Sequence, residues 1–155
     1  MENIEFKIWF SKLKISNKNK LKLIKDFENI ENIWKSNEKE LSFFGYENDL
    51  IIKLLNYSDK ENLEKESIIL QREKTKIISI LDNEYPKRLK EIDNSPVQIY
   101  IKGNEKKLYE DNIGIIGSRN ASEYGKNISR QISNDLSSEG INIVSRHTKP
   151  RSAQD

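Results

Sequence analysis

The sequence predicts an α/β protein in which a bundle of short helices precedes a strand–helix–strand unit. Three observations predict this class. Apolar residues recur at helical spacing from Glu2 to Tyr57, and apolar and polar residues alternate from 97 to 102. The apolar run Ile113–Ile116 is followed by a glycine and by a helical pattern over Ser122–Ser138. At 155 residues the chain is long enough to bury a sizeable core.

The composition narrows the classes of function. Lysine and arginine number 27 against 25 acidic residues, so nucleic-acid binding would need a local basic patch rather than bulk charge. Cysteine is absent and His147 is the single histidine, so the sequence predicts no metal site, no catalytic residues and no cofactor. There is neither a signal-peptide pattern nor an apolar run of about 18 residues, and we expect a soluble, cytoplasmic protein that does not enter membranes.

The first 58 residues are predicted to form four or five short helices around one small core. Asn37 followed by Glu40 is a capping box, and Gly45 is a stop signal. The segment 41–46 between two helices is typical of a helix-hairpin-helix or SAM-like bundle, a class that often contacts the DNA backbone. The apolar residues at helical spacing are Phe6, Trp9, Phe10, Leu13, Leu21, Ile24, Phe27, Ile30, Ile33, Trp34, Leu41, Phe44, Leu50, Ile51, Leu54 and Leu55.

Two features of this bundle have competing interpretations. Lysines lie at 12, 14, 18, 20, 22 and 25, but acidic residues at 26, 28 and 31 follow, and such a run is more often a solvated helix face than a DNA-binding one. Trp9 and Trp34 are interpreted as core residues rather than as platforms for stacked bases.

A linker helix is predicted over 59–76. A strand is predicted over Ile77–Leu81, then a short helix with Pro86 at its first position, ending near Ile92. A half-buried strand is predicted over Val97–Ile101, closed by Gly103.

The turn Gly117-Ser118-Arg119 is the candidate binding site. The strand before it and the helix after it bring a glycine turn and a helix N-terminus to one place, where free backbone N–H groups favour an anion. The guanidinium of Arg119 adds a bidentate donor for an oxyanion. The motif is neither a Walker loop nor a complete GxGxxG, and a plain strand-to-helix turn with a solvated arginine is the alternative.

The helix after this turn is predicted to start at the N-cap Ser122 and to stop at Gly140. Its stripe of Tyr124, Ile128, Ile132 and Leu136 is predicted to face the sheet. A second strand over Ile141–Val144 completes a βαβ unit.

Three stretches, taken in order, resemble the DNA-processing protein A family, also called Smf. They are Tyr85-Pro86 with Leu89 and Ile92, residues 96–104, and residues 113–125 leading into 143–145. The N-terminal helices resemble that family's SAM-like domain. The resemblance therefore covers residues 1 to about 145 and implies the first part of an extended Rossmann-like domain over 77–145.

The resemblance also implies a function. The family binds single-stranded DNA and loads RecA onto it in natural transformation, displacing single-strand-binding protein, and is not enzymatic in the usual sense. By position, Gly117, Ser118 and Arg119 match its phosphate-contacting Gly-Ser-Arg turn, and Tyr124 and Gly125 match its Tyr-Gly. The latter two are interpreted as packing residues, with stacking on a DNA base as the alternative for Tyr124.

The ten residues 146–155 depart from the family, which continues with a glycine loop and a further helix. They contain no Ile, Leu, Val or Asn, although the preceding chain is rich in Ile and Asn. The expectation is a tail foreign to the family on a truncated domain, without the homodimer surface of full-length members. An uncovered apolar face and an exposed sheet edge would follow.

Two other functions were weighed. One is a nucleotide-phosphate hydrolase of the Rossmann-like lysine-decarboxylase-annotated group, which shares the Gly-Ser turn but uses a Pro-Gly-Gly loop and a catalytic glutamate that this sequence lacks. The other is an inactive fragment that keeps only its helical bundle as a protein-interaction module.

Overall fold

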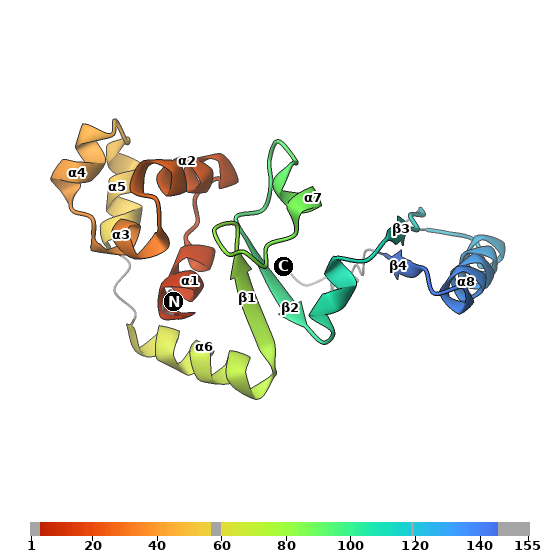
Figure 1. Ribbon diagram of the computed structural model, residues 1–155. Coiled ribbons are helices and arrows are strands. Elements are labelled where there is room, and N and C mark those ends of the chain that lie inside the picture. Colours follow the sequence, from red (N-terminus) through yellow and green to blue (C-terminus); the bar gives the residue numbers. More distant parts are fainter. Residues whose placement is uncertain (1–3, 57–59, 119, 146–155) are drawn as a thin grey trace. The chain divides into compact units, whose positions relative to one another are not determined.

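The structure, a computed structural model, describes residues 4–56, 60–118 and 120–145. The chain divides into two compact units, Met1–Glu105 and Lys106–Asp155, which are described separately. In chain order the elements are α1 (Ile4–Lys12), α2 (Asn17–Phe27), α3 (Ile30–Lys35), α4 (Glu38–Phe43), α5 (Asn48–Leu55), α6 (Lys60–Arg72), β1 (Thr75–Ser79), α7 (Lys87–Lys90), β2 (Gln98–Lys102), the 3-10 helix Glu105–Leu108, β3 (Asn112–Gly114), α8 (Glu123–Ser138) and β4 (Asn142–Val144) (Figure 1). The α/β class is confirmed.

Short polar side chains cap the N-termini of α2, α3 and α4. The side chains of Ser16, Asn29 and Asn37 each accept a hydrogen bond from a backbone N–H of the following helix. Such caps typically contribute about 1 kcal/mol each, because they satisfy N–H groups that have no partner within the helix. The predicted capping box is confirmed, since Glu40 also accepts from the backbone N–H of Asn37. The predicted stop is confirmed as well: Gly45 follows α4 with a φ of 73°.

The first unit has one core, to which helices and strands both contribute. Trp9 and Phe10 of α1, Leu23 of α2 and Leu63 of α6 are buried together with Ile78 of β1. Fully burying side chains of this size contributes about 1.5–3 kcal/mol each. Trp9 packs edge-on against the half-buried Trp34, with ring centroids 4.9 Å apart, so both tryptophans are core residues as predicted.

The strands β1 and β2 form an antiparallel pair in which Thr75 lies opposite Lys102 and Ser79 opposite Gln98. The first strand begins two residues earlier than predicted and the linker helix ends earlier, at Arg72. Lys74 has a φ of 51°, a left-handed conformation that ends the helical path, so the chain reverses there. Pro86 is the N-cap of α7 rather than its first helical residue.

The packing places the boundary between compact units at a different position from the domain boundary that the sequence predicts. The pair β1–β2 belongs to the same compact unit as the helices, and that unit extends to Glu105. The domain organisation predicted from the sequence therefore remains a proposal. It consists of a bundle over 1–58, a linker over 59–76 and a second domain over 77–145. The tail 146–155 and the residue His147 lie outside the described residues.

The second unit contains the predicted strand–helix–strand segment. The strands β3 and β4 are parallel, with Ile113 opposite Ile143, and α8 connects them. The N-cap Ser122 is confirmed, and Gly140 follows the helix with a φ of 80°. None of the described residues of this unit is fully buried.

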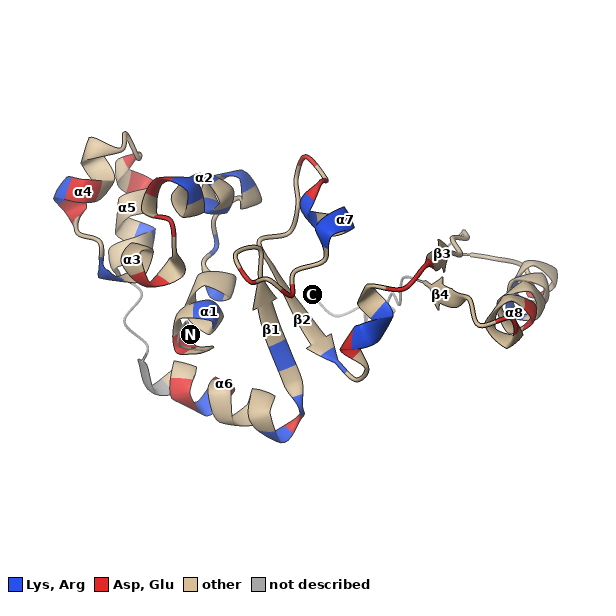
Figure 2. Ribbon diagram, in the orientation of Figure 1, with Lys and Arg blue, Asp and Glu red and all other residues tan. Residues whose placement is uncertain are grey.

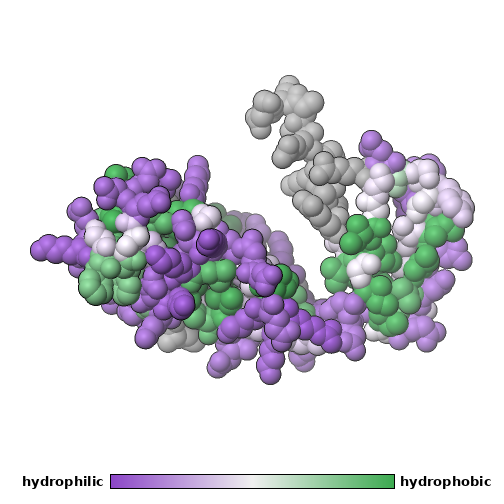
Figure 3. All heavy atoms as spheres, turned by 90° about the horizontal axis from the view of Figure 1, so that it is seen from above, coloured by the Kyte–Doolittle hydropathy of each residue, from purple (hydrophilic) through white to green (hydrophobic). Residues whose placement is uncertain are grey.

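The predicted sheet-facing stripe of α8 is wrong for three of its four residues. Tyr124, Ile128 and Ile132 are 76%, 36% and 47% exposed, whereas Leu136 is half-buried. The two strands have three residues each, too narrow a surface to cover the whole stripe. Hydrophobic side chains consequently gather on one face of this unit, shown in green at the right of Figure 3. The predicted uncovered apolar face is present among the described residues.

Candidate phosphate-binding turn

The candidate turn begins where β3 stops pairing with β4. The backbone N–H of Ile115 still donates to the carbonyl of Val144, at 2.9 Å. Beyond it Ile116 is 95% exposed, and Gly117 and Ser118 are also exposed. Because β3 and β4 are parallel, the carboxyl ends of both strands lie at the same edge as this turn, which is where ligands bind in open sheets of this kind.

The helix N-terminus that follows is well formed. The hydroxyl of Ser122 accepts from the backbone N–H of Gly125 at 3.2 Å, which fixes the start of the 16-residue helix α8. Other N–H groups of the first turn have no acceptor within the helix, and the positive end of the helix dipole adds to their attraction for an anion. Glu123 competes with such an anion, but its carboxylate pairs with Lys126 at 2.7 Å.

Gly117 has open space in front of its backbone. A Cβ built there would meet nothing within 4 Å, and the residue does not adopt a left-handed conformation. Neither packing nor backbone strain among the described residues therefore requires glycine at this position. A ligand that approaches the peptide closely would require it.

Ser118 shapes the turn from within. Its hydroxyl accepts from the backbone N–H of Asn120 at 3.2 Å, a local bond typical of a serine turn. The structure thus brings Gly117 and Ser118 to the N-terminal side of α8, as the sequence predicts. Arg119, the third residue of the motif, lies outside the described residues.

Several charged side chains of this unit have polar partners. Glu110 accepts hydrogen bonds from Lys107 and from the amide of Asn142, and these two bonds, in that order, lower the pKa of its carboxyl. Arg130 donates to the side chain of Asn127 at 3.0 Å, further along α8. In the first unit, lysine and arginine are prominent on α2 and α7 (Figure 2). Lys20 of α2 is not simply solvated, because its ammonium donates to the carbonyl of Ser11 and burial lowers its pKa.

No group of three or more His, Asp or Glu residues among the described residues could hold a metal ion. No helix in the described part of the chain is long and apolar enough to cross a bilayer.

Comparison with known proteins shows a family that the second half of the chain resembles. Residues 76–148 match the family described as DNA recombination-mediator protein A, and the matched segment contains the whole candidate turn. The expected resemblance to DNA-processing protein A, or Smf, is thereby confirmed.

Two curated relatives extend the similarity toward the N-terminus. Protein Smf of Borreliella burgdorferi is 28% identical over 131 residues, which are 84% of this chain and 41% of that protein. Protein Smf of Synechocystis is 28% identical over 129 residues, or 80% of this chain and 32% of that protein. The chain thus spans less than half the length of either relative.

One feature of the first unit was missed by the sequence reasoning. A hollow of about 380 Å³ lies among α2, α3 and α4, with Phe27 and Phe44 among its lining residues. Both phenylalanines were assigned to the helical core by their spacing. The adjacent pair Phe43-Phe44 was the available signal, because two neighbouring residues at the end of a helix cannot both face the same core.

Proposed function

We propose that this chain binds single-stranded DNA without sequence preference and acts in recombination or natural transformation. Gly117, Ser118 and Arg119 would contact the phosphate backbone, together with the N-terminus of α8. The observation that carries the proposal is the exposed Gly117-Ser118 backbone leading directly into the N-cap Ser122, within the segment that matches the recombination-mediator family.

The geometry favours a phosphate over a neutral ligand. Exposed backbone, first-turn N–H groups and the positive helix end all favour negative charge, and the open space at Gly117 admits a close approach. The contacts involve backbone and phosphate rather than base edges, so they carry no sequence information. With a net charge of only +2, the chain depends on such a local site to bind nucleic acid.

The wider activity of the family is proposed on the same basis. Bound single-stranded DNA would be passed to RecA, with displacement of single-strand-binding protein, and no covalent chemistry would take place. Since the chain spans 41% and 32% of the two curated relatives, RecA loading is proposed for a form that contains the remaining family sequence.

Fluorescence anisotropy tests the DNA site directly. A labelled oligothymidylate is titrated with the parent chain, Arg119→Ala and the control Arg130→Ala, each at two salt concentrations. Loss of one charge-assisted phosphate contact is expected to weaken binding about tenfold. It should also reduce the slope of log K against log salt by about 0.7.

Arg130→Ala removes the same charge from the exposed side of α8 and should change binding little. Equal losses in the two variants would indicate general attraction to positive charge instead of a site at the turn. Absence of binding by the parent chain would contradict the proposal for this chain.

A further inference from the structure

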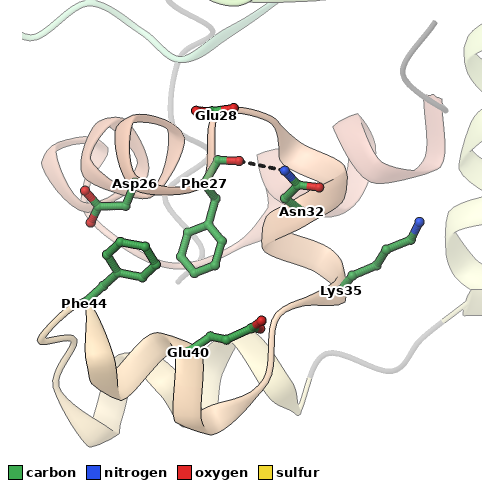
Figure 4. Close-up of a pocket in the computed structure, with 7 residues that line it drawn as sticks. All are labelled: Asp26, Phe27, Glu28, Asn32, Lys35, Glu40 and Phe44. Atoms are coloured by element: carbon green, nitrogen blue, oxygen red, sulfur yellow. Dashed lines mark hydrogen bonds between the residues drawn. The ribbon is translucent and has the colours of Figure 1, made fainter.

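The hollow among α2, α3 and α4 has an aromatic wall and an acidic rim. The rings of Phe27 and Phe44 are in contact, with centroids 5.0 Å apart, and both line the hollow (Figure 4). Phe27 is 9% exposed and Phe44 is 38% exposed, so Phe44 presents most of the accessible ring surface. The ammonium of Lys22 lies close by and donates to the carbonyl of Phe44 at 3.1 Å. The carboxylates of Asp26, Glu28 and Glu40 line the hollow, and its lining residues include one ammonium, that of Lys35. That ammonium points away from the rings and pairs with Glu31 at 2.5 Å.

Two of the carboxylates are held in place by their own hydrogen bonds. Asp26 accepts from the hydroxyl of Tyr46 at 2.6 Å, and Glu40 accepts from the backbone N–H of Asn37 at 3.0 Å. Each bond uses one carboxylate oxygen, and an ionised carboxylate has acceptor capacity for further donors. The rim is therefore ordered in advance and can still bind a donor-rich cation.

Glu28 occupies a position that local stability disfavours. Its φ is 68°, and the N–H of Asn29 donates to the carbonyl of Phe27 across it, which makes a γ-turn of the rare, strained kind. Glycine is the residue suited to positive φ. Glu28 also places a negative charge at the C-terminal end of α2, where the helix dipole is already negative. Both the positive φ and the charge at this helix end are unfavourable for stability. Their presence at Glu28 therefore indicates that its carboxylate has a role other than stability.

The outer edge of the hollow is apolar. Phe43 is 86% exposed and packs its ring against Phe44, with centroids 5.7 Å apart. A phenyl ring this exposed gives no burial energy to the isolated chain, but it would do so beneath a partner. Nucleic acid does not fit here, because the carboxylates of Asp26, Glu28 and Glu40 would repel its phosphates.

We propose that this hollow is a docking site for a basic segment of a protein partner, which places an arginine or lysine side chain in the hollow, against Phe44 and beside the three carboxylates. The cation lies against the ring of Phe44 and donates to the rim carboxylates. An apolar residue next to it in the partner covers Phe43. Charge complementarity defines this occupant, and the site is separate from the proposed DNA-binding turn.

The test uses the full chain and a short peptide probe that carries one arginine flanked by leucines. A second peptide has citrulline, the uncharged analogue, in place of arginine. Binding is followed by the amide NMR shifts of the protein. We expect saturable shifts at Glu28, Asn32 and Phe44 with the arginine peptide, and binding at least tenfold weaker with the citrulline peptide.

Protein variants assign the binding to the hollow. Glu28→Gln keeps the size and backbone strain of the residue but removes its charge, and it should weaken peptide binding severalfold. Glu38→Gln removes the same charge from the exposed start of α4 and should leave binding unchanged. Glu28→Gly should also weaken binding while leaving the thermal midpoint unchanged or higher, which a purely structural role for Glu28 would not produce.

Four results would overturn the proposal. The first three are equal binding of the two peptides, equal effects of Glu28→Gln and Glu38→Gln, and the absence of any shift at these amides. A fourth would be saturable shifts at the same amides with oligothymidylate, which would assign the hollow to nucleic acid. None of these outcomes depends on the turn at Gly117, so the two proposals fail separately.

Discussion

The ammonium of Lys7 on α1 lies 2.7 Å from the carboxylate of Asp82, a residue 75 positions later in the turn after β1. Both side chains are largely buried, at 13% and 22% exposed. Asp82 also accepts from the backbone N–H of Ser79 at 2.7 Å. The carboxylate of Asp82 therefore links the C-terminal end of β1 to α1.

Removing this carboxylate should destabilise the first unit. We expect Asp82→Ala to lower the free energy of unfolding by about 2–4 kcal/mol, because it leaves the Lys7 ammonium and a backbone N–H without their acceptor. Urea unfolding followed by tryptophan fluorescence measures this, since Trp9 and Trp34 both lie in the first unit. The control Asp49→Ala breaks only an exposed pair with Lys53 and should cost less than about 1 kcal/mol. Similar costs in the two variants would contradict a structural role for Asp82.

Tyr46 should make stability fall at high pH. Burial, the hydrogen bond to Asp26 and the charge of that carboxylate raise the pKa of Tyr46 above its ordinary value of about 10. The folded chain thus holds the phenolic proton more tightly than the unfolded chain does. This difference stabilises the folded chain. The stabilisation is fully present below about pH 10 and is lost as pH rises through the pKa of Tyr46 in the folded chain.

Tyr46→Phe isolates this effect. At neutral pH we expect the variant to lose about 1–2 kcal/mol with the hydrogen bond. In urea titrations repeated upward from about pH 8, the parent should lose stability more steeply than the variant. The comparison with the variant is needed because burial lowers the pKa of Lys20, which makes stability increase with pH in the same range. Parallel pH profiles would show that Tyr46 does not carry the dependence.

Limited proteolysis should yield a core that includes the strand pair β1–β2. Ile78 and Val97 are buried with the helical core, whereas no described residue after Val97 is buried. Trypsin is expected to cleave first after Lys106 or Lys107, next to the boundary between the two units. Mass spectrometry of the early fragments is the measurement. A resistant fragment ending between Tyr57 and Lys76 would instead mean that the helical bundle is stable alone.

The exposed stripe of α8 should tolerate polar substitution. Since Ile132 is 47% exposed and Tyr124 is 76% exposed, Tyr124→Ser with Ile132→Gln should alter the helix content of the full chain little. The same double variant should self-associate less, because the apolar face of the second unit becomes smaller. Circular dichroism and sedimentation velocity measure the two effects. A loss of helix content with unchanged association would restore the stripe as a buried, sheet-facing surface.

Local interactions were predictable from the sequence. The capping box of Asn37 and Glu40, the N-cap Ser122 and the stops at Gly45 and Gly140 each involve residues within a few positions of one another. For the same reason the candidate turn could be located, since strand, glycine and helix start are consecutive. The boundary at Arg72 was missed because no local signal marks the left-handed Lys74.

By itself the sequence determined the order and type of most elements and the caps that begin and end them. Those properties follow from local hydrogen bonding and hydrophobic periodicity. Only the tertiary structure decided that β1 and β2 complete the core of the helices, and that Asp26, Glu28 and Glu40 line one hollow with two phenyl rings. Such contacts join residues far apart in the chain, such as Lys7 and Asp82, and periodicity shows which face of an element is apolar but not what it packs against.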